Sequence, residues 1–183
     1  MARGLPRLVR MPARLPALLL GALLLAAAPA AADTGHVGLV GGALTLDEGN
    51  ETQWRPYARA ELGLRLWGPF ELGAHLQMAT AGFPAELASF GGGVMVQLRP
   101  DVALFGFLVP HAEVAGSRVT LPTGSGRLDA WELRVGGGLG FEPGAGFVIE
   151  ARLHHHWYFD LPASADVGTE GWTVTAGVTY RIP

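Results

Sequence analysis

The feature that most constrains the fold is a period-two alternation of apolar and polar residues that returns in eight segments. In residues 57–66 the even positions carry Ala and Leu, whereas the odd positions carry Tyr57, Arg59, Glu61, Gly63 and Arg65. Successive side chains of a β-strand point to opposite faces of the sheet, so each segment has one apolar and one polar face. We therefore predict an all-β chain with antiparallel strands at residues 36–46, 57–66, 70–78, 90–98, 102–114, 131–141, 147–157 and 172–182.

The polar face is rich in glycine, and its charges nearly balance. We count Arg59, Arg65, Arg99, Arg134, Arg152 and Arg181 against Glu61, Glu71, Glu113, Glu132 and Glu150. A buried charge is costly unless it is paired, so this balance favours a narrow closed lumen over a solvated surface. The charge network predicted for that lumen comprises Arg59, Glu61, Arg65, Glu71, His75, Glu132, Arg134, Glu150, Arg152, His154 and His156.

The segment ends and the linkers indicate a membrane wall. Aromatic residues gather at one end (Trp54, Tyr57, Trp131, Trp157 and Trp172) and at the other (Phe70, Phe141, Phe147 and Tyr180). Such girdles flank the apolar band of transmembrane barrels, in which short turns on one side alternate with long loops on the other. We expect short linkers at 67–69, 99–101 and 143–145, and longer ones at about 47–53, 79–85, 115–128 and 159–171. These features predict an up-and-down transmembrane β-barrel of eight strands, with both termini on the periplasmic side.

The N-terminal residues have the pattern of an export signal. Four arginines precede the apolar run 15–28, and small residues then lead to Asp33. This order is typical of a secretory signal peptide, so we predict a signal at residues 1–32 and a barrel domain at 33–183. The mature chain then has nine arginines against sixteen acidic residues, a formal charge of −7, which argues against a nucleic-acid partner.

Over the whole mature chain the pattern resembles the small eight-stranded outer-membrane barrels of the OmpA/OmpX type. Residues 172–182 are similar to the C-terminal assembly signal of that class, although Ile182 stands where an aromatic residue is usual. The resemblance implies a bacterial outer-membrane protein in contact with outer-membrane lipid and lipopolysaccharide, and recognition of the last strand by the barrel-assembly machinery. An eight-stranded barrel has room only for its own side chains, so we expect no open pore and a structural or surface-loop role.

Two other functions and a metal site remain open at this stage. A soluble periplasmic ligand-binding barrel of lipocalin type would turn the apolar face inward. A lipid A-modifying enzyme of the deacylase group carries its His in the strand that here holds His154–His156, but that pattern needs a Ser two residues later, where Trp157 or Tyr158 stands. His154 and His156 with Glu132 or Glu113 have the residue types of a metal site, yet a hydrogen-bonded lumen network is the commoner explanation. We therefore predict no catalytic residue, metal or cofactor.

The short linkers also predict which residues face each other across two hairpins. A three-residue turn at Trp67-Gly68-Pro69 places Leu66 opposite Phe70, and hence Arg65 opposite Glu71, Glu61 opposite His75 and Arg59 opposite Gln77. A turn of the same length at Pro143-Gly144-Ala145 places Glu142 opposite Gly146, Arg134 opposite His154 and Glu132 opposite His156. Directly opposed side chains on one face of a sheet are nearest neighbours, so charged residues are predicted to pair there.

Overall fold

The structure is a computed structural model, and it describes residues 35–48, 51–80, 88–100, 104–105, 107–123, 126–144, 146–162 and 168–182. The predicted signal peptide and its cleavage site lie outside these residues and stay a prediction. None of the described residues belongs to a helix with the length and hydropathy needed to cross a membrane.

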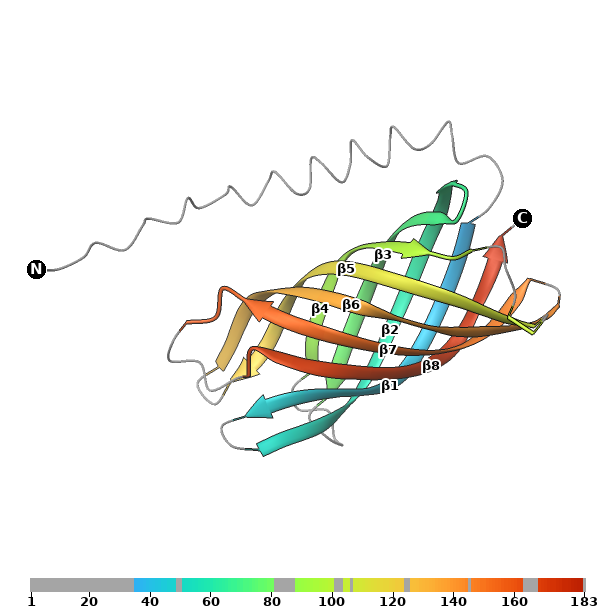
Figure 1. Cartoon of the computed structure of the whole chain (residues 1–183). Helices are drawn as coiled ribbons and strands as arrows, with labels where there is room; N and C mark the ends of the chain where they lie inside the picture. The colour runs from blue at the N-terminus through green and yellow to red at the C-terminus, as the bar shows by residue number, and fades with distance from the viewer. Residues whose placement is uncertain are drawn as a thin grey trace, which may run out of the picture. The chain divides into compact units, whose positions relative to one another are not determined.

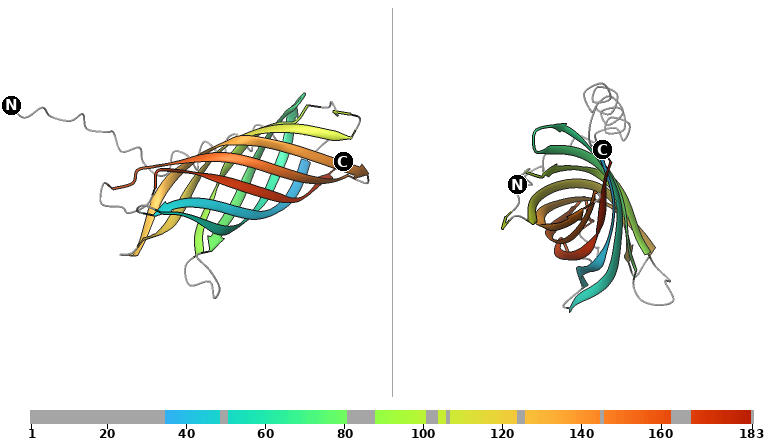
Figure 2. Two further views of the ribbon diagram at one scale, coloured as in Figure 1. Left: turned by 60° about the horizontal axis from the view of Figure 1, so that its bottom comes forward. Right: turned by 90° about the vertical axis from the view of Figure 1, so that its right-hand side faces the viewer.

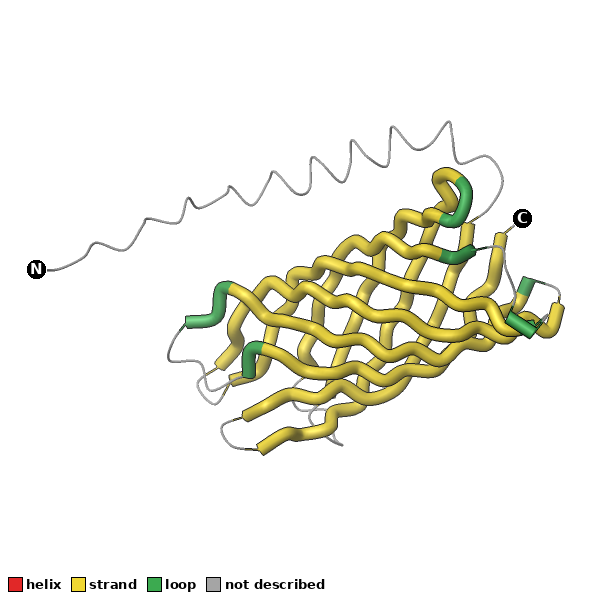
Figure 3. The backbone as a smooth tube through the Cα atoms, viewed as in Figure 1, coloured by secondary structure: helices red, strands yellow, loops and turns green. Residues whose placement is uncertain are grey.

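Eight antiparallel strands close into a barrel in which each strand pairs with the next along the chain and β8 pairs with β1. Figures 1 and 3 show the strands winding around one axis, and Figure 2 shows the ring from two further sides. The predicted fold class is confirmed. The strands are β1 (Gly35–Glu48), β2 (Glu51–Trp67), β3 (Phe70–Thr80), β4 (Ala88–Leu98), β5 (Leu108–Thr123), β6 (Gly126–Gly144), β7 (Phe147–Phe159) and β8 (Glu170–Ile182).

The polar face of every strand points into the barrel. In β2, Arg59 and Glu61 are buried, whereas the neighbouring Leu62 is 51% exposed on the outside. The same alternation runs along β7, from buried Arg152 to exposed Leu153. The apolar face thus forms the outer wall, which is the arrangement predicted for a membrane barrel and the opposite of a lipocalin. Tyr57 is an exception to the predicted girdle: it occupies a polar-face position and lies buried in the lumen.

The structure corrects the predicted extent of the strands. β5 begins at Leu108 and continues to Thr123, so the loop expected at 115–128 is mostly a hairpin in which β5 pairs with β6 as far as Thr123 and Gly126. β1 and β2 similarly leave only residues 49–50 between them, whereas the linker after β4 is longer than the expected 99–101. The expected asymmetry of linker lengths is therefore wrong at these places. Residues 115–123 escaped prediction because Ala115, Gly116 and Ser117 give a weak contrast between the two faces.

One of the two predicted registers is right and the other is wrong by two residues. Across β2 and β3, the pairs Arg65–Glu71, Glu61–His75 and Arg59–Gln77 are observed, although Trp67 replaces Leu66 as the partner of Phe70, through an irregularity between residues 65 and 67. Across β6 and β7, Arg134 faces His156, Glu132 faces Tyr158, and His154 faces Gly136. The error arises at the turn, because Gly144 pairs with Phe147 after an irregularity between residues 141 and 144. A shift of two residues keeps every side chain on its face.

Candidate functional site: the charged lumen

The interior of the barrel holds a balanced set of buried charges. Among the described residues these are five arginines and five glutamates: Arg55, Arg59, Arg99, Arg134, Arg152, Glu61, Glu71, Glu113, Glu132 and Glu150. Of the eleven residues predicted to form the lumen network, the structure places ten in the buried interior. The eleventh, Arg65, lies at the rim with 24% of its side chain exposed, 3.8 Å from Glu71.

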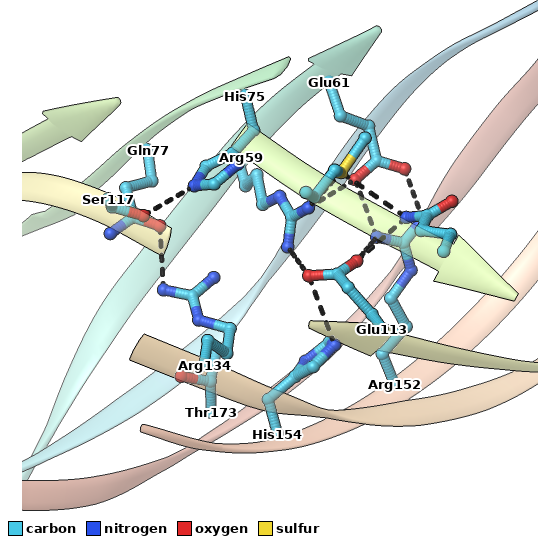
Figure 4. Close-up of polar contacts among 12 residues, drawn as sticks. Arg59, Glu61, His75, Gln77, Glu113, Ser117, Arg134, Arg152, His154 and Thr173 are labelled. Carbon is cyan, nitrogen blue, oxygen red and sulfur yellow. Dashed lines mark hydrogen bonds and ion pairs between the residues drawn. The ribbon is translucent and has the colours of Figure 1, made fainter. Parts of the chain in front are cut away.

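Glu113 is the centre of this network, and sequence reasoning left it out of the predicted set. Its Oε1 accepts a hydrogen bond from Arg59 Nη1 at 2.6 Å, and its Oε2 accepts one from Gln97 Nε2 at 2.8 Å. Arg152 Nη1 and His154 Nε2 lie 3.5 and 3.6 Å away from the same carboxylate (Figure 4). The sequence feature that could have identified Glu113 is its position on the polar face of the fifth alternating segment. Glu113 therefore links four side chains from three other strands, β2, β4 and β7.

A chain of alternating charges runs on from Glu113. Arg59 Nη2 lies 3.2 Å from Glu61 Oε2, and Arg152 donates to both oxygens of Glu61, to Oε2 at 2.7 Å. Arg152 also donates to Glu150 Oε1 at 2.5 Å, and Arg99 Nη2 donates to Glu150 Oε2 at 3.3 Å. Because these side chains are buried, each carboxylate needs its arginines to offset the cost of burial.

A second cluster surrounds Arg134. Its guanidinium donates to Glu132 Oε1 and Gln77 Oε1, both at 2.7 Å, and to Tyr57 Oη at 2.5 Å. Gln77 in turn donates to Glu132 Oε2 at 2.5 Å, which closes a ring of hydrogen bonds between β2, β3 and β6. Gln77 and Tyr57 were not in the predicted set. Arg134 is thus held by three strands, although only Glu132 carries the opposite charge.

We call the end of the barrel with the β2–β3 turn, the start of β1 and the end of β8 the turn end, and the opposite end the loop end. Near the turn end, His36 Nδ1 lies 2.9 Å from Glu71 Oε2, and its Nε2 lies 3.6 Å from Glu61 Oε1. Arg99 Nε lies 3.6 Å from Glu71, and His111 Nε2 lies 3.7 Å from Glu150. Polar groups therefore continue to this rim, where Arg65 is partly exposed.

Glycines let these side chains meet across two strand spacings. Gly93 lies between His75 and Ser117 in adjoining pairs, and Gly136 lies in the same way between Glu113 and His154. A Cβ on Gly93 would sit 2.7 Å from Ser117 Cα, and one on Gly136 would sit 2.6 Å from His154 Cα. The glycine runs at 91–93 and 136–138 therefore make room in a crowded lumen.

The loop end of the lumen is mostly apolar, although buried Arg55 also lies there, opposite Leu44. A buried cluster there comprises Leu44, Tyr57, Ala79, Val119, Leu121, Ala130 and Tyr158, with Leu161 packed against it. These residues lie on the inward face at the ends of β1, β3, β5 and β7 and at the starts of β2 and β6. We call this cluster the apolar cap. The charge network is thus covered by the apolar cap at the loop end and reaches a polar rim at the turn end.

A buried serine–histidine pair lies just below the apolar cap. Ser117 Oγ is 2.8 Å from His75 Nε2, a nucleophile–base distance that sequence reasoning missed because the two residues lie on β5 and β3. His75 Nδ1 has no hydrogen-bond partner among the described residues, so the acid that orients the base of a triad is absent from this part of the chain. Both side chains are buried among the polar residues of the lumen, at 3% and 1% exposure.

The His154–His156 segment does not assemble into a metal centre in the described part of the barrel. No group of three His, Asp or Glu side chains there is placed to hold an ion. His156 Nδ1 lies 3.3 Å from Thr173 Oγ1, and its ring is 5.1 Å from that of Tyr158. His155 points outward between Trp157 and Trp172, at ring distances of 4.4 and 4.5 Å.

Comparison with solved structures places this geometry among known barrels. Neisserial surface protein A matches with a TM-score of 0.62 and 12% identity, over 80% of this chain and 96% of that one. The N-terminal β-barrel domain of Pseudomonas aeruginosa OprF matches with a TM-score of 0.58 and 12% identity, over 80% of this chain and 97% of that one. The attachment invasion locus protein Ail of Yersinia pestis matches with a TM-score of 0.55 and 14% identity, over 82% of this chain and 99% of that one.

The fold is that of the small eight-stranded outer-membrane β-barrels. No protein-family model and no curated protein sequence matches the chain. At 12–14% identity the likeness concerns the fold alone, so the activity of this barrel has to be argued from its own residues.

Proposed function

We propose that the protein is a closed outer-membrane barrel with a structural or surface-interaction role and no open pore. The location is supported by the outer wall, where large apolar side chains such as Leu39, Leu62, Leu76 and Leu153 are half or more exposed. A monomeric soluble protein rarely presents so continuous an apolar surface to water. In this arrangement the wall contacts outer-membrane lipid and lipopolysaccharide, both termini lie in the periplasm, and β8 is the strand that the assembly machinery recognises.

The buried, ion-paired interior is the observation that carries the proposal of a closed barrel. Arg59, Arg134 and Arg152 cross the interior and are each bound to a carboxylate at 2.7 Å or less. The apolar cap lies above them, so an ion entering from the loop end would meet this cluster and then arginines that are already bound to carboxylates. Function is thereby left to the outer wall and to the loop-end surface of the barrel.

The test is a conductance measurement on the purified protein in planar lipid bilayers. We expect no stable current steps at moderate voltage, under conditions in which a trimeric porin gives clear ones. Reproducible steps that scale with protein concentration would overturn the closed barrel. Fractionation tests the location separately: the mature protein should sediment with outer membranes and resist carbonate extraction, and recovery as a soluble periplasmic protein would overturn it.

A further inference from the structure

The linker between β4 and β5 exposes a cluster of large apolar side chains at the turn end. Leu104, Phe105 and Phe107 are 44%, 87% and 49% exposed, and Phe105 is the most exposed large apolar residue in the described part of the chain. The apolar sequence predicts a strand from residue 102, yet β5 begins only at Leu108. The barrel itself therefore does not account for these apolar residues.

Backbone hydrogen bonds join Leu104, Phe107 and Leu108 at the end of this linker. Leu104 N–H donates to Leu108 O at 2.6 Å, Leu108 N–H donates to Leu104 O at 3.0 Å, and Phe107 N–H also donates to Leu104 O, at 3.2 Å. Phe105 at the tip has a φ of +54°, a left-handed conformation that a bulky side chain rarely adopts. Such a residue persists where its surroundings impose it, which marks the tip as a candidate functional feature. The turn thus presents a phenylalanine at a position where glycine or asparagine is usual.

The exposed cluster continues the outer wall. The Phe107 ring packs edge-on against that of Phe141, with centroids 6.2 Å apart, and Phe141 is itself 44% exposed on the outer face of β6. Phe147 and Tyr180, whose rings are 5.0 Å apart, lie further along the same end of the wall. An aromatic surface that is continuous with the lipid-facing wall fits the girdle at the membrane boundary.

We propose that Leu104, Phe105 and Phe107 form an interfacial anchor in which Phe105 inserts into the headgroup boundary of the membrane leaflet at the turn end. The inference rests on the proposed outer-membrane location, in which this is the periplasmic, phospholipid leaflet. The segment Leu104-Phe105-Gly106-Phe107 carries no charge, and the continuity with Phe141 favours lipid over a protein partner. At the same end Trp67 and Phe70 flank the β2–β3 turn, 65% and 38% exposed with ring centroids 5.6 Å apart, so Phe105 joins other exposed aromatic side chains there.

The absence of cysteine allows a direct test with single spin labels. The full-length barrel is refolded into phosphatidylcholine vesicles with a nitroxide at Phe105→Cys, and its accessibility to oxygen and to a water-soluble nickel chelate is compared with two controls. Leu139→Cys, on the outer wall, marks lipid; Asp160→Cys, whose side chain is 75% exposed beyond β7, marks water. We expect the label at 105 to lie between the controls in depth, with a nickel accessibility severalfold below that at 160.

A label at 105 that matches the label at 160 overturns the anchor while leaving the barrel in place. A label at 139 that reports water shows instead that the proposed location fails. Because a nitroxide could itself seek the interface, a second pair places the label at Leu104→Cys with Phe105 either retained or changed to Asn, which tolerates the left-handed backbone. Loss of Phe105 should move the label at 104 toward water; an unchanged depth also overturns the proposal. Shielding from both reagents, found only in native outer membranes, would identify a protein partner and contradict lipid insertion.

Discussion

The ion pair between Glu61 and Arg152 gives the sharpest test of the lumen network. Both side chains have no exposed surface, and Arg152 donates to both oxygens of Glu61, to Oε2 at 2.7 Å. Changing Glu61 to Gln keeps the shape but removes the charge that faces Arg152 and Arg59. Arg59 is then left with Glu113, and Arg152 with Glu150 and Glu113, so five buried arginines face four glutamates.

The expected cost follows from this imbalance. Removing one partner of a buried ion pair lowers the free energy of unfolding by about 3–5 kcal/mol, because the remaining buried charge is no longer sufficiently compensated. We expect Glu61→Gln and Arg152→Met each to lower the free energy of unfolding by that amount. The double variant restores charge balance and leaves Glu150 with Arg99 and Glu113 with Arg59. Its cost should therefore fall short of the sum of the single costs, by roughly 0.5–3 kcal/mol as in other coupled pairs.

The measurement is urea unfolding of the refolded barrel in lipid vesicles, followed by tryptophan fluorescence and by the mobility of unboiled samples on gels. Arg65→Met is the matched control: this side chain is partly exposed and 3.8 Å from Glu71, so its loss should cost about 1 kcal/mol or less. Costs for Glu61 and Arg152 that add within error would refute the coupling. A control as damaging as the buried variants would refute the distinction between the rim and the interior.

Three further predictions follow from the wall, the glycines and the N-terminus. Gly93→Ala should cost about 1–3 kcal/mol in the same unfolding assay, as overpacking does, whereas Gly116→Ala, whose added Cβ meets no atom within 4 Å, should be nearly neutral; equal effects would contradict the steric role. Val135→Arg on the outer wall should cost roughly 2–4 kcal/mol near the membrane midplane, and a variant as stable as the parent would place that wall outside lipid. Mass spectrometry of the exported protein should find a mature chain that begins at Asp33; an intact N-terminus in the outer-membrane fraction would show that the signal is retained.

The faces of the barrel could be read from the sequence because one physical rule determines them. The outer face of every strand belongs to one apolar wall, so alternation alone tells which residues point outward. β7 obeys this rule along its whole length, and β2 obeys it from Arg55 to Leu64. The rule weakens where a strand leaves that wall. At the loop end the inward residues of β5 become Val119 and Leu121, while Arg118 points outward, 44% exposed and over the ring of Trp131. In β5 at the apolar cap the inward face is apolar and the outward face polar, the reverse of the rest of the barrel. The sequence therefore predicts a loop where the structure has a hairpin.

The partners inside the lumen depend on geometry that alternation does not contain. Arg59 faces Gln77 on the neighbouring strand, as the register predicted, but its 2.6 Å contact is to Glu113 on β5, three strands along. Such reach spans a crowded lumen in which glycines on the intervening strands leave room, as at Gly93 on β4, where an added Cβ would approach Ser117 Cα to 2.7 Å. A two-residue error at the β6–β7 turn also changes every opposed pair in that hairpin without moving any residue off its face. Charge balance on one face was therefore predictable from the sequence, whereas the arginine that neutralises each glutamate is decided by the closure of the barrel.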